Sequence, residues 1–335
     1  MWPSRIFQSL SLRMPARFSY PTVAPLPEST EFDRWLASEL DQLRIIQGHE
    51  TAEPSFVSSS SYMSCEWVSR AMKVAVGTQK RAVEVIKGAC CREEDGGVIN
   101  GYLDYVIELL DACNGLRERT ESTRRYVELV SSILRCLRAE QGPTHAALER
   151  ARSMLGSLER AWRGWTELDP WNSGFRKIGE RMDRSRACRR ELEEALHASK
   201  STALFACRTL SVSLSFKSNR RVVGTQGSQL GSCSTSLDEL QNEVKAEVEK
   251  RRTGGGPLLN ELRPVASAAQ TLRELLLRRL ENDDSRRELR STVETLSRSC
   301  HELEQGIKRL EGRVNKLYRS LISVRVALLD ILSGY

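Results

Sequence analysis

The feature that most constrains the fold is a heptad repeat of apolar residues late in the sequence. The repeat alternates spacings of three and four over more than five heptads: Val293, Leu296, Cys300, Leu303, Ile307, Leu310, Val314, Leu317, Leu321, Val324, Leu328 and Ile331. We call these residues the apolar seam. Each buried apolar side chain contributes roughly 1.5–3 kcal/mol, so a helix with this stripe must be buried along its length. The sequence therefore predicts one long helix packed against other helices.

The partner of the seam is either the same chain or a second copy in a parallel dimer. In a parallel dimer, the flanking residues would form pairs without charge attraction: Arg313 with Tyr318, Gly306 with Glu311, and Ser320 with Arg325. Small residues beside the seam would let neighbouring helices approach closely: Ser299, Gly306, Ser320 and Ala327. Ile322, Val326 and Leu329 make the last turns apolar nearly all round, as expected inside a bundle. We therefore favour an intramolecular antiparallel bundle.

The rest of the chain also indicates helices. Helix-forming Leu, Ala, Arg and Glu dominate, and aromatic residues make up only 6%. Apolar periodicity predicts helices at about 31–43, 62–87, 98–138, 143–162, 191–216, 237–252 and 258–276. The Gly164–Gly174 stretch, with Trp165 and Trp171, breaks the pattern and is expected to be a loop. The predicted class is all-α: an antiparallel bundle of long helices with a coiled-coil-like C-terminal helix.

The organisation along the chain follows from these breaks. We expect a disordered basic, proline-rich tail, an N-terminal helical segment, a loop with a basic segment, a helix, a flexible linker and a C-terminal helical segment. The tail is residues 1–29 and the N-terminal helical segment is 30–165. The loop with the basic segment is 166–190, the helix 191–216, the linker 217–236 and the C-terminal helical segment 237–333. The last segment is expected to pack with residues 62–139 into one bundle.

The cellular location is less constrained. Residues 1–27 contain arginines and serines but no acid, which is the composition of a transit peptide and equally of a disordered basic tail. The most apolar stretch, 195–216, is interrupted by His197, Lys200 and Arg208, so no membrane span is predicted. We expect a cytoplasmic protein that associates with membranes, if at all, at their surface. The alternative is import into a chloroplast or mitochondrion through residues 1–27.

No motif indicates catalysis or cofactor binding. GxxxxGK[ST] and GxGxxG are absent, the four histidines are scattered, and the nine cysteines include no CxxC. Glu194-x-x-His197 has the spacing of a carboxylate-bundle metal site but lacks the second copy that such a site needs. Glu243, Glu247 and Glu249 are interpreted as residues of charged faces with i,i+4 partners. We expect no enzyme, no cofactor, no metal site and no small-molecule substrate.

The best candidate for a contact site is a run of basic residues: Arg176, Lys177, Arg181, Arg184, Arg186, Arg189 and Arg190. A solvated helix face is the default interpretation. The functional alternatives are docking to anionic lipid headgroups or to an acidic protein partner. Nucleic acid is not expected, because aromatic residues do not interleave with this run. The formal charge of +7 does not require nucleic acid either.

Three stretches resemble the plant BYPASS family, which is grouped with the ROH-like proteins. They are residues 66–86, 102–137 and 237–272. The most specific part is the YLD…LLDxCN pattern of the second stretch, formed by Tyr102, Leu103, Asp104, Leu109, Leu110, Asp111, Cys113 and Asn114. The resemblance implies a helical, non-catalytic regulator of plant development, tied to a root-derived mobile signal that restrains the shoot. It also implies a link to secretion, because ROH-like members are associated with an Exo70-type subunit of the exocyst.

The expected function combines both lines of reasoning. We expect a non-enzymatic scaffold or adaptor that acts by protein–protein interaction in development and root-to-shoot signalling. The alternative is a peripheral membrane or trafficking factor, associated with the exocyst, that binds anionic lipid through the basic run.

Overall fold

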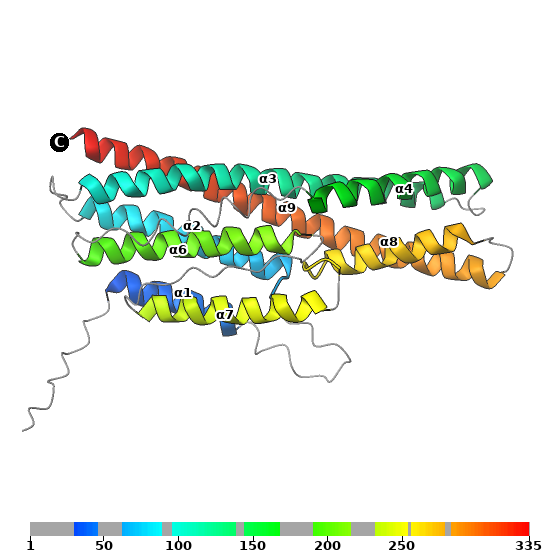
Figure 1. Cartoon of the computed structure of the whole chain (residues 1–335), viewed down its shortest axis with the longest axis horizontal. Helices are drawn as coiled ribbons and strands as arrows, with labels where there is room; N and C mark the ends of the chain where they lie inside the picture. Colours follow the sequence, from blue (N-terminus) through cyan, green and yellow to red (C-terminus); the bar gives the residue numbers. More distant parts are fainter. Residues whose placement is uncertain are drawn as a thin grey trace, which may run out of the picture.

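The computed structural model describes residues 30–45, 62–88, 96–138, 144–167, 190–215, 232–253, 256–278 and 283–334. These ranges contain eight α-helices and no strand (Figure 1). The helices are α1 (Glu31–Ile45), α2 (Cys65–Gly88), α3 (Gly96–Leu137), α4 (His145–Glu167), α6 (Arg190–Ser213), α7 (Ser232–Thr253), α8 (Leu262–Leu277) and α9 (Asp283–Ser333). The predicted all-α class is therefore confirmed.

The apolar seam lies on α9 and is buried against helices of the same chain. Every seam residue from Val293 to Leu328 is buried, and Ile331 is partly buried. The neighbours of α9 are α2, α3 and α8, and Figure 1 shows α3 and α9 running beside each other along the long axis. The intramolecular bundle is thus confirmed, and no open seam remains for a parallel dimer.

Contacts between side chains fix the helix directions. Arg117 Nε of α3 donates to Asn315 Oδ1 of α9 at 2.7 Å, and Ser131 Oγ lies 3.6 Å from Cys300 Sγ. Residue numbers rise on α3 as they fall on α9, so these two helices are antiparallel. By the same reasoning α2 runs parallel to α9, because Glu66 lies near Arg309 and Ser69 accepts a hydrogen bond from Arg313.

A small residue sets the crossing of α2 and α9. A Cβ atom placed on Gly306 would lie 2.4 Å from Cys65 Sγ, closer than two such atoms can approach. The absence of a side chain at Gly306 therefore allows α2 to pack tightly on the seam. This agrees with the predicted role of small residues beside the seam.

The helix α6 is buried on all sides. Each residue from Ser201 to Ser211 is buried, although several are polar. A buried hydrogen-bond network joins it to α2 and α3. The Tyr102 hydroxyl donates to Gln79 Oε1 at 2.9 Å and lies 2.9 Å from Ser199 Oγ, while Gln79 Nε2 donates to the Ser199 carbonyl. Small hydroxyl side chains let α6 fit between its neighbours, and the network satisfies the buried polar groups of Tyr102, Gln79 and Ser199.

The carboxylates of α7 are placed differently from the prediction. Glu243 does not pair along its own helix; it accepts hydrogen bonds from Arg44 of α1, with Arg44 Nη2 at 2.7 Å, and from the Tyr62 hydroxyl. Glu247 does pair with Arg251 at i,i+4, but that ion pair is nearly buried, with side chains 12% and 7% exposed. Helical spacing cannot reveal partners about 200 residues away, so the expectation of an i,i+4 partner for Glu243 was wrong.

Two further expectations need correction. Ile322, Val326 and Leu329 are 42%, 53% and 47% exposed, because α2 and α3 pack on the seam of α9 and these three residues lie outside the seam. The helix α4 continues to Glu167, so Trp165 lies in a helix and not in a loop. Trp171 lies outside the described residues.

Other parts of the sequence interpretation fall outside the described ranges. The tail 1–29, residues 168–189 and most of the expected linker 217–236 are not described, although α7 already begins at Ser232. Among the described helices, none combines the length and the hydropathy needed to cross a bilayer.

Candidate partner-binding groove

The described surface has a groove between α3 and α9. Its volume is about 870 Å³. The described lining residues are Arg124, Val127, Glu128, Ser131, Ser132, Leu134, Arg135 and Arg138 from α3 and its end, and Ser297, Cys300, His301, Glu304, Ile307 and Lys308 from α9. We call this site the basic groove.

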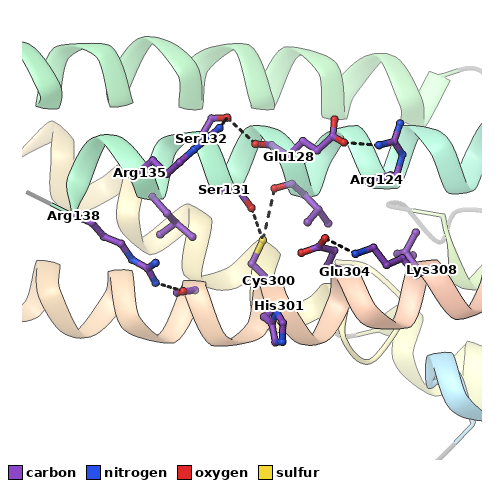
Figure 2. Close-up of a pocket in the computed structure, with 14 residues that line it drawn as sticks. Arg124, Glu128, Ser131, Ser132, Arg135, Arg138, Cys300, His301, Glu304 and Lys308 are labelled. Carbon is purple, nitrogen blue, oxygen red and sulfur yellow. Dashed lines mark hydrogen bonds and ion pairs between the residues drawn. The ribbon is translucent and has the colours of Figure 1, made fainter.

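The floor of the groove is formed where two small side chains, Ser131 of α3 and Cys300 of α9, face each other. Ser131 and Cys300 meet where larger side chains meet elsewhere, and the Cys300 thiol also donates to the Val127 carbonyl at 3.7 Å. Figure 2 shows Cys300 pointing from α9 toward α3. Small side chains on the floor leave a hollow that the long side chains on the rim surround.

The rim is rich in cations. The described lining carries Arg124, Arg135, Arg138 and Lys308 against two carboxylates, Glu128 and Glu304. Both carboxylates already have partners, since Arg124 Nη1 lies 2.5 Å from Glu128 Oε1 and Lys308 Nζ lies 3.0 Å from Glu304 Oε1 (Figure 2). The groove therefore has an excess of positive charge.

Two arginines supply that excess. Arg135 Nη2 donates to Ser132 Oγ at 2.9 Å, and Arg138 donates to Ser297 Oγ across the groove. Both side chains are exposed, and neither has a carboxylate partner among the described residues. A guanidinium presents a fork of donors that matches a carboxylate, so Arg135 and Arg138 can each receive an acidic group without breaking an ion pair.

The groove offers little for catalysis. Burial raises the pKa of the Cys300 thiol above its ordinary value, which keeps the thiol protonated and weakly nucleophilic at neutral pH. The His301 ring points away from α3 in Figure 2 and lies 2.8 Å from Gln305 Nε2. No group of three or more His, Cys, Asp or Glu side chains among the described residues could hold a metal ion. The arrangement suits recognition of an anion.

The basic run predicted from the sequence is not tested by the described structure. Arg176, Lys177, Arg181, Arg184, Arg186 and Arg189 lie outside the described residues, and Arg190 begins α6 with its side chain not described. Their contact with lipid or protein stays a prediction. The sequence placed the groove residues in two predicted helices but did not predict that they form a groove. Neither helix alone shows which turn of α3 faces which turn of α9.

A second cluster of polar groups lies where α3 meets α6. The Lys200 ammonium lies 5.4 Å and 5.5 Å from the ring centroids of Tyr102 and Tyr105, and the Tyr105 hydroxyl donates to the Lys200 carbonyl at 2.7 Å. Burial lowers the pKa of Lys200. The aromatic rings stabilise the cation by cation–π attraction, so this cluster is explained by packing.

Comparison with known protein families identifies a match over most of the chain. A family model described as Protein BPS1 matches residues 84–331, which include all of α3 and nearly all of α9. No curated protein and no solved structure matches the chain.

Proposed function

The chain belongs to the Protein BPS1 family, and from that premise we propose that it is a non-enzymatic helical adaptor that binds an acidic segment of a partner protein in the basic groove. The BYPASS-type resemblance supports a role in plant development and root-to-shoot signalling. In this proposal the adaptor contributes a fixed surface and no chemistry.

One observation carries the proposal: Arg135 and Arg138 line an open groove, and the hydrogen-bond partners of their guanidinium groups are serine hydroxyls. Exposed ion pairs contribute about 0–1 kcal/mol, so the pairs already present on the rim would oppose an incoming carboxylate only weakly. A groove between two rigid helices also keeps these arginines in position before binding, which reduces the entropy lost on association.

The test is a charge reversal in plant cells. The full chain carrying Arg135→Glu with Arg138→Glu is compared with the wild type and with a control, Lys73→Glu with Lys80→Glu, whose residues lie exposed on α2. Proximity labelling should show a set of partners that the wild type and control share and that the groove variant loses. Restoration of normal shoot growth in plants lacking the protein should fail with the same variant. Equal labelling and equal restoration by all three proteins would exclude the groove as the adaptor site.

A further inference from the structure

Exposed apolar residues are concentrated at one end of the α3–α9 pair. Ile322, Val326 and Leu329 lie on α9 at i, i+4 and i+7, and Ile107 of α3 is 40% exposed. Only one other large apolar side chain of the described residues is as exposed, Leu277 of α8. Single exposed apolar residues are ordinary, but a group on one surface indicates an interaction site. We call Ile107, Ile322, Val326 and Leu329 the apolar end patch.

The antiparallel register of α3 and α9 places Ile107 beside the exposed apolar residues of α9 along the bundle axis. Arg117 bonds Asn315, and the Arg117 guanidinium lies 4.4 Å from the centre of the Tyr318 ring. Ile107 precedes Arg117 by about three turns, and Val326 follows Asn315 by about three turns. Ile107 is therefore at the same height as the exposed residues of α9.

Three residues of the patch, Ile107, Ile322 and Leu329, continue the face that forms the basic groove, and Val326 lies one turn along α9 from Ile322 and from Leu329. Ile322 and Leu329 follow His301 and Lys308 by three heptads each, and Ile107 precedes Glu128 by three heptads. In helices packed with a heptad seam, residues separated by whole heptads share one face. The same face of α3 and α9 is thus cationic at one end and apolar at the other.

Positive charge also flanks the apolar patch. Arg319 and Arg325 are exposed on either side of Ile322, and neither has an ion-pair partner among the described residues. Cations therefore border the apolar patch as well as the groove, and a ligand that covers the whole face must bring acidic groups to the groove and apolar groups to the patch.

We propose that the partner segment is an acidic amphipathic helix that lies along α3 and α9, with carboxylates in the basic groove and apolar side chains on the apolar end patch. This inference rests on the proposed function and specifies its ligand. The face from Arg138 to Ile107 spans about 30 residues of α3, or about 45 Å at 1.5 Å per residue, so one helix of similar length covers it. A flat lipid surface could cover the patch but could not enter the hollow between the two helices.

The experiment uses designed peptides and the full chain. The probe is a fluorescent helical peptide of about 30 residues, with glutamates on one face of its first half and leucines on the same face of its second half. Two further peptides replace the glutamates by glutamine or the leucines by alanine. Fluorescence anisotropy should show that either replacement weakens binding to the wild-type protein by about tenfold or more.

Two protein variants locate the contacts. Val326→Ser with Leu329→Ser should weaken the full probe about tenfold while binding the alanine peptide as the wild type does. Arg135→Glu with Arg138→Glu should abolish binding. Leu277→Ser, an exposed apolar position on α8, and Lys73→Glu with Lys80→Glu are the matched controls and should bind like the wild type. Circular dichroism of each variant checks that the fold is intact.

The outcomes separate this inference from the proposed function. Loss of binding in the arginine variant with no effect of the serine variant would overturn the extended helix and leave the basic groove as the adaptor site. No effect of either variant would overturn both. The inference is also overturned if Val326→Ser with Leu329→Ser instead abolishes binding to phosphatidylcholine–phosphatidylserine vesicles, or converts a dimer of the free protein to a monomer.

Discussion

Two central helices, α9 and α6, achieve burial in opposite ways. The helix α9 buries one apolar seam and keeps mostly charged and polar residues on its other faces, whereas α6 is buried all round and carries Ser199, Ser201, Thr202 and Thr209 inside the bundle. The stability contributed by α9 should come from apolar area and close fit. Around α6 it should depend on whether each polar group finds a partner.

The difference also explains which helix was easier to interpret from sequence. A stripe with a period of seven predicts both a helix and the side that is buried. A helix surrounded by others needs no stripe, and its small polar residues resemble those of a surface or a linker. The two modes of burial predict different responses to mutation and to pH.

The largest effect is expected from a charge in the seam. Leu310 is fully buried, so Leu310→Asp places a carboxylate without a partner between α9 and its neighbours. We expect a loss of about 4 kcal/mol or more and unfolding of the bundle at moderate temperature. Thermal melting by circular dichroism measures this, with Lys316→Asp on the exposed side of α9 as the control. Unchanged melting of Leu310→Asp would show that the seam is not buried.

A smaller effect is expected where the seam meets α2. Gly306→Ala forces a methyl group against Cys65, and we expect a loss of about 1–3 kcal/mol. Gly312→Ala on the same helix meets no atom within 4 Å and should stabilise by up to about 1 kcal/mol, the usual preference of a helix for alanine. Chemical denaturation compares the two. Equal shifts in the same direction would contradict the close crossing.

The third prediction moves to the polar surroundings of α6. Tyr102→Phe removes the hydroxyl that bonds Gln79 and Ser199, leaving their polar groups buried with fewer partners. We expect a loss of about 1–2 kcal/mol. In a double-mutant cycle with Ser199→Ala, the two effects should not add, because the residues share one network. Strict additivity in urea denaturation would mean that the network contributes no coupling.

The smallest effect concerns pH. Burial would raise the pKa of Glu243, but hydrogen bonds from Arg44 and Tyr62 outweigh it and hold the pKa below its ordinary value of 4.5. The folded protein therefore binds this proton less readily than the unfolded chain, so the contribution is present above about pH 4.5 and is lost as pH falls through the folded pKa. Since Glu243 is 37% exposed, we expect less than about 1 kcal/mol. Urea denaturation between pH 6 and 3 should show a smaller acid loss for Arg44→Met than for the wild type.

Much of the fold was predictable from the sequence, and the basic groove was not. The seam, the helices and the role of Gly306 follow from local spacing and residue size. The groove requires that Ser131 meet Cys300 and that Arg117 meet Asn315, whereas a heptad pattern fits equally well after a shift of seven residues. For the same reason Glu243 was assigned a partner within its own helix, whereas its partner Arg44 lies in a distant helix.

The apolar residues at the end of α9 show a related limit. Ile322, Val326 and Leu329 are as apolar as the seam, and the pattern of one helix does not tell how many neighbours surround it. The structure covers only one side of α9 there. Their hydrophobicity predicted that these three residues are buried, but too few helices surround the end of α9 to cover them.

The pairing of α2 with α9 has a consequence for how the protein is made. Cys65 packs on Gly306, so about 240 residues must be synthesised after Cys65 before the side of α2 that faces α9 can be covered. At roughly 5–20 residues per second, the ribosome needs about 10–50 seconds for this. During that time the apolar faces of α2 and α3 remain available to chaperones and to other nascent chains. Biogenesis of this protein should therefore depend on protection of the nascent chain until α9 emerges.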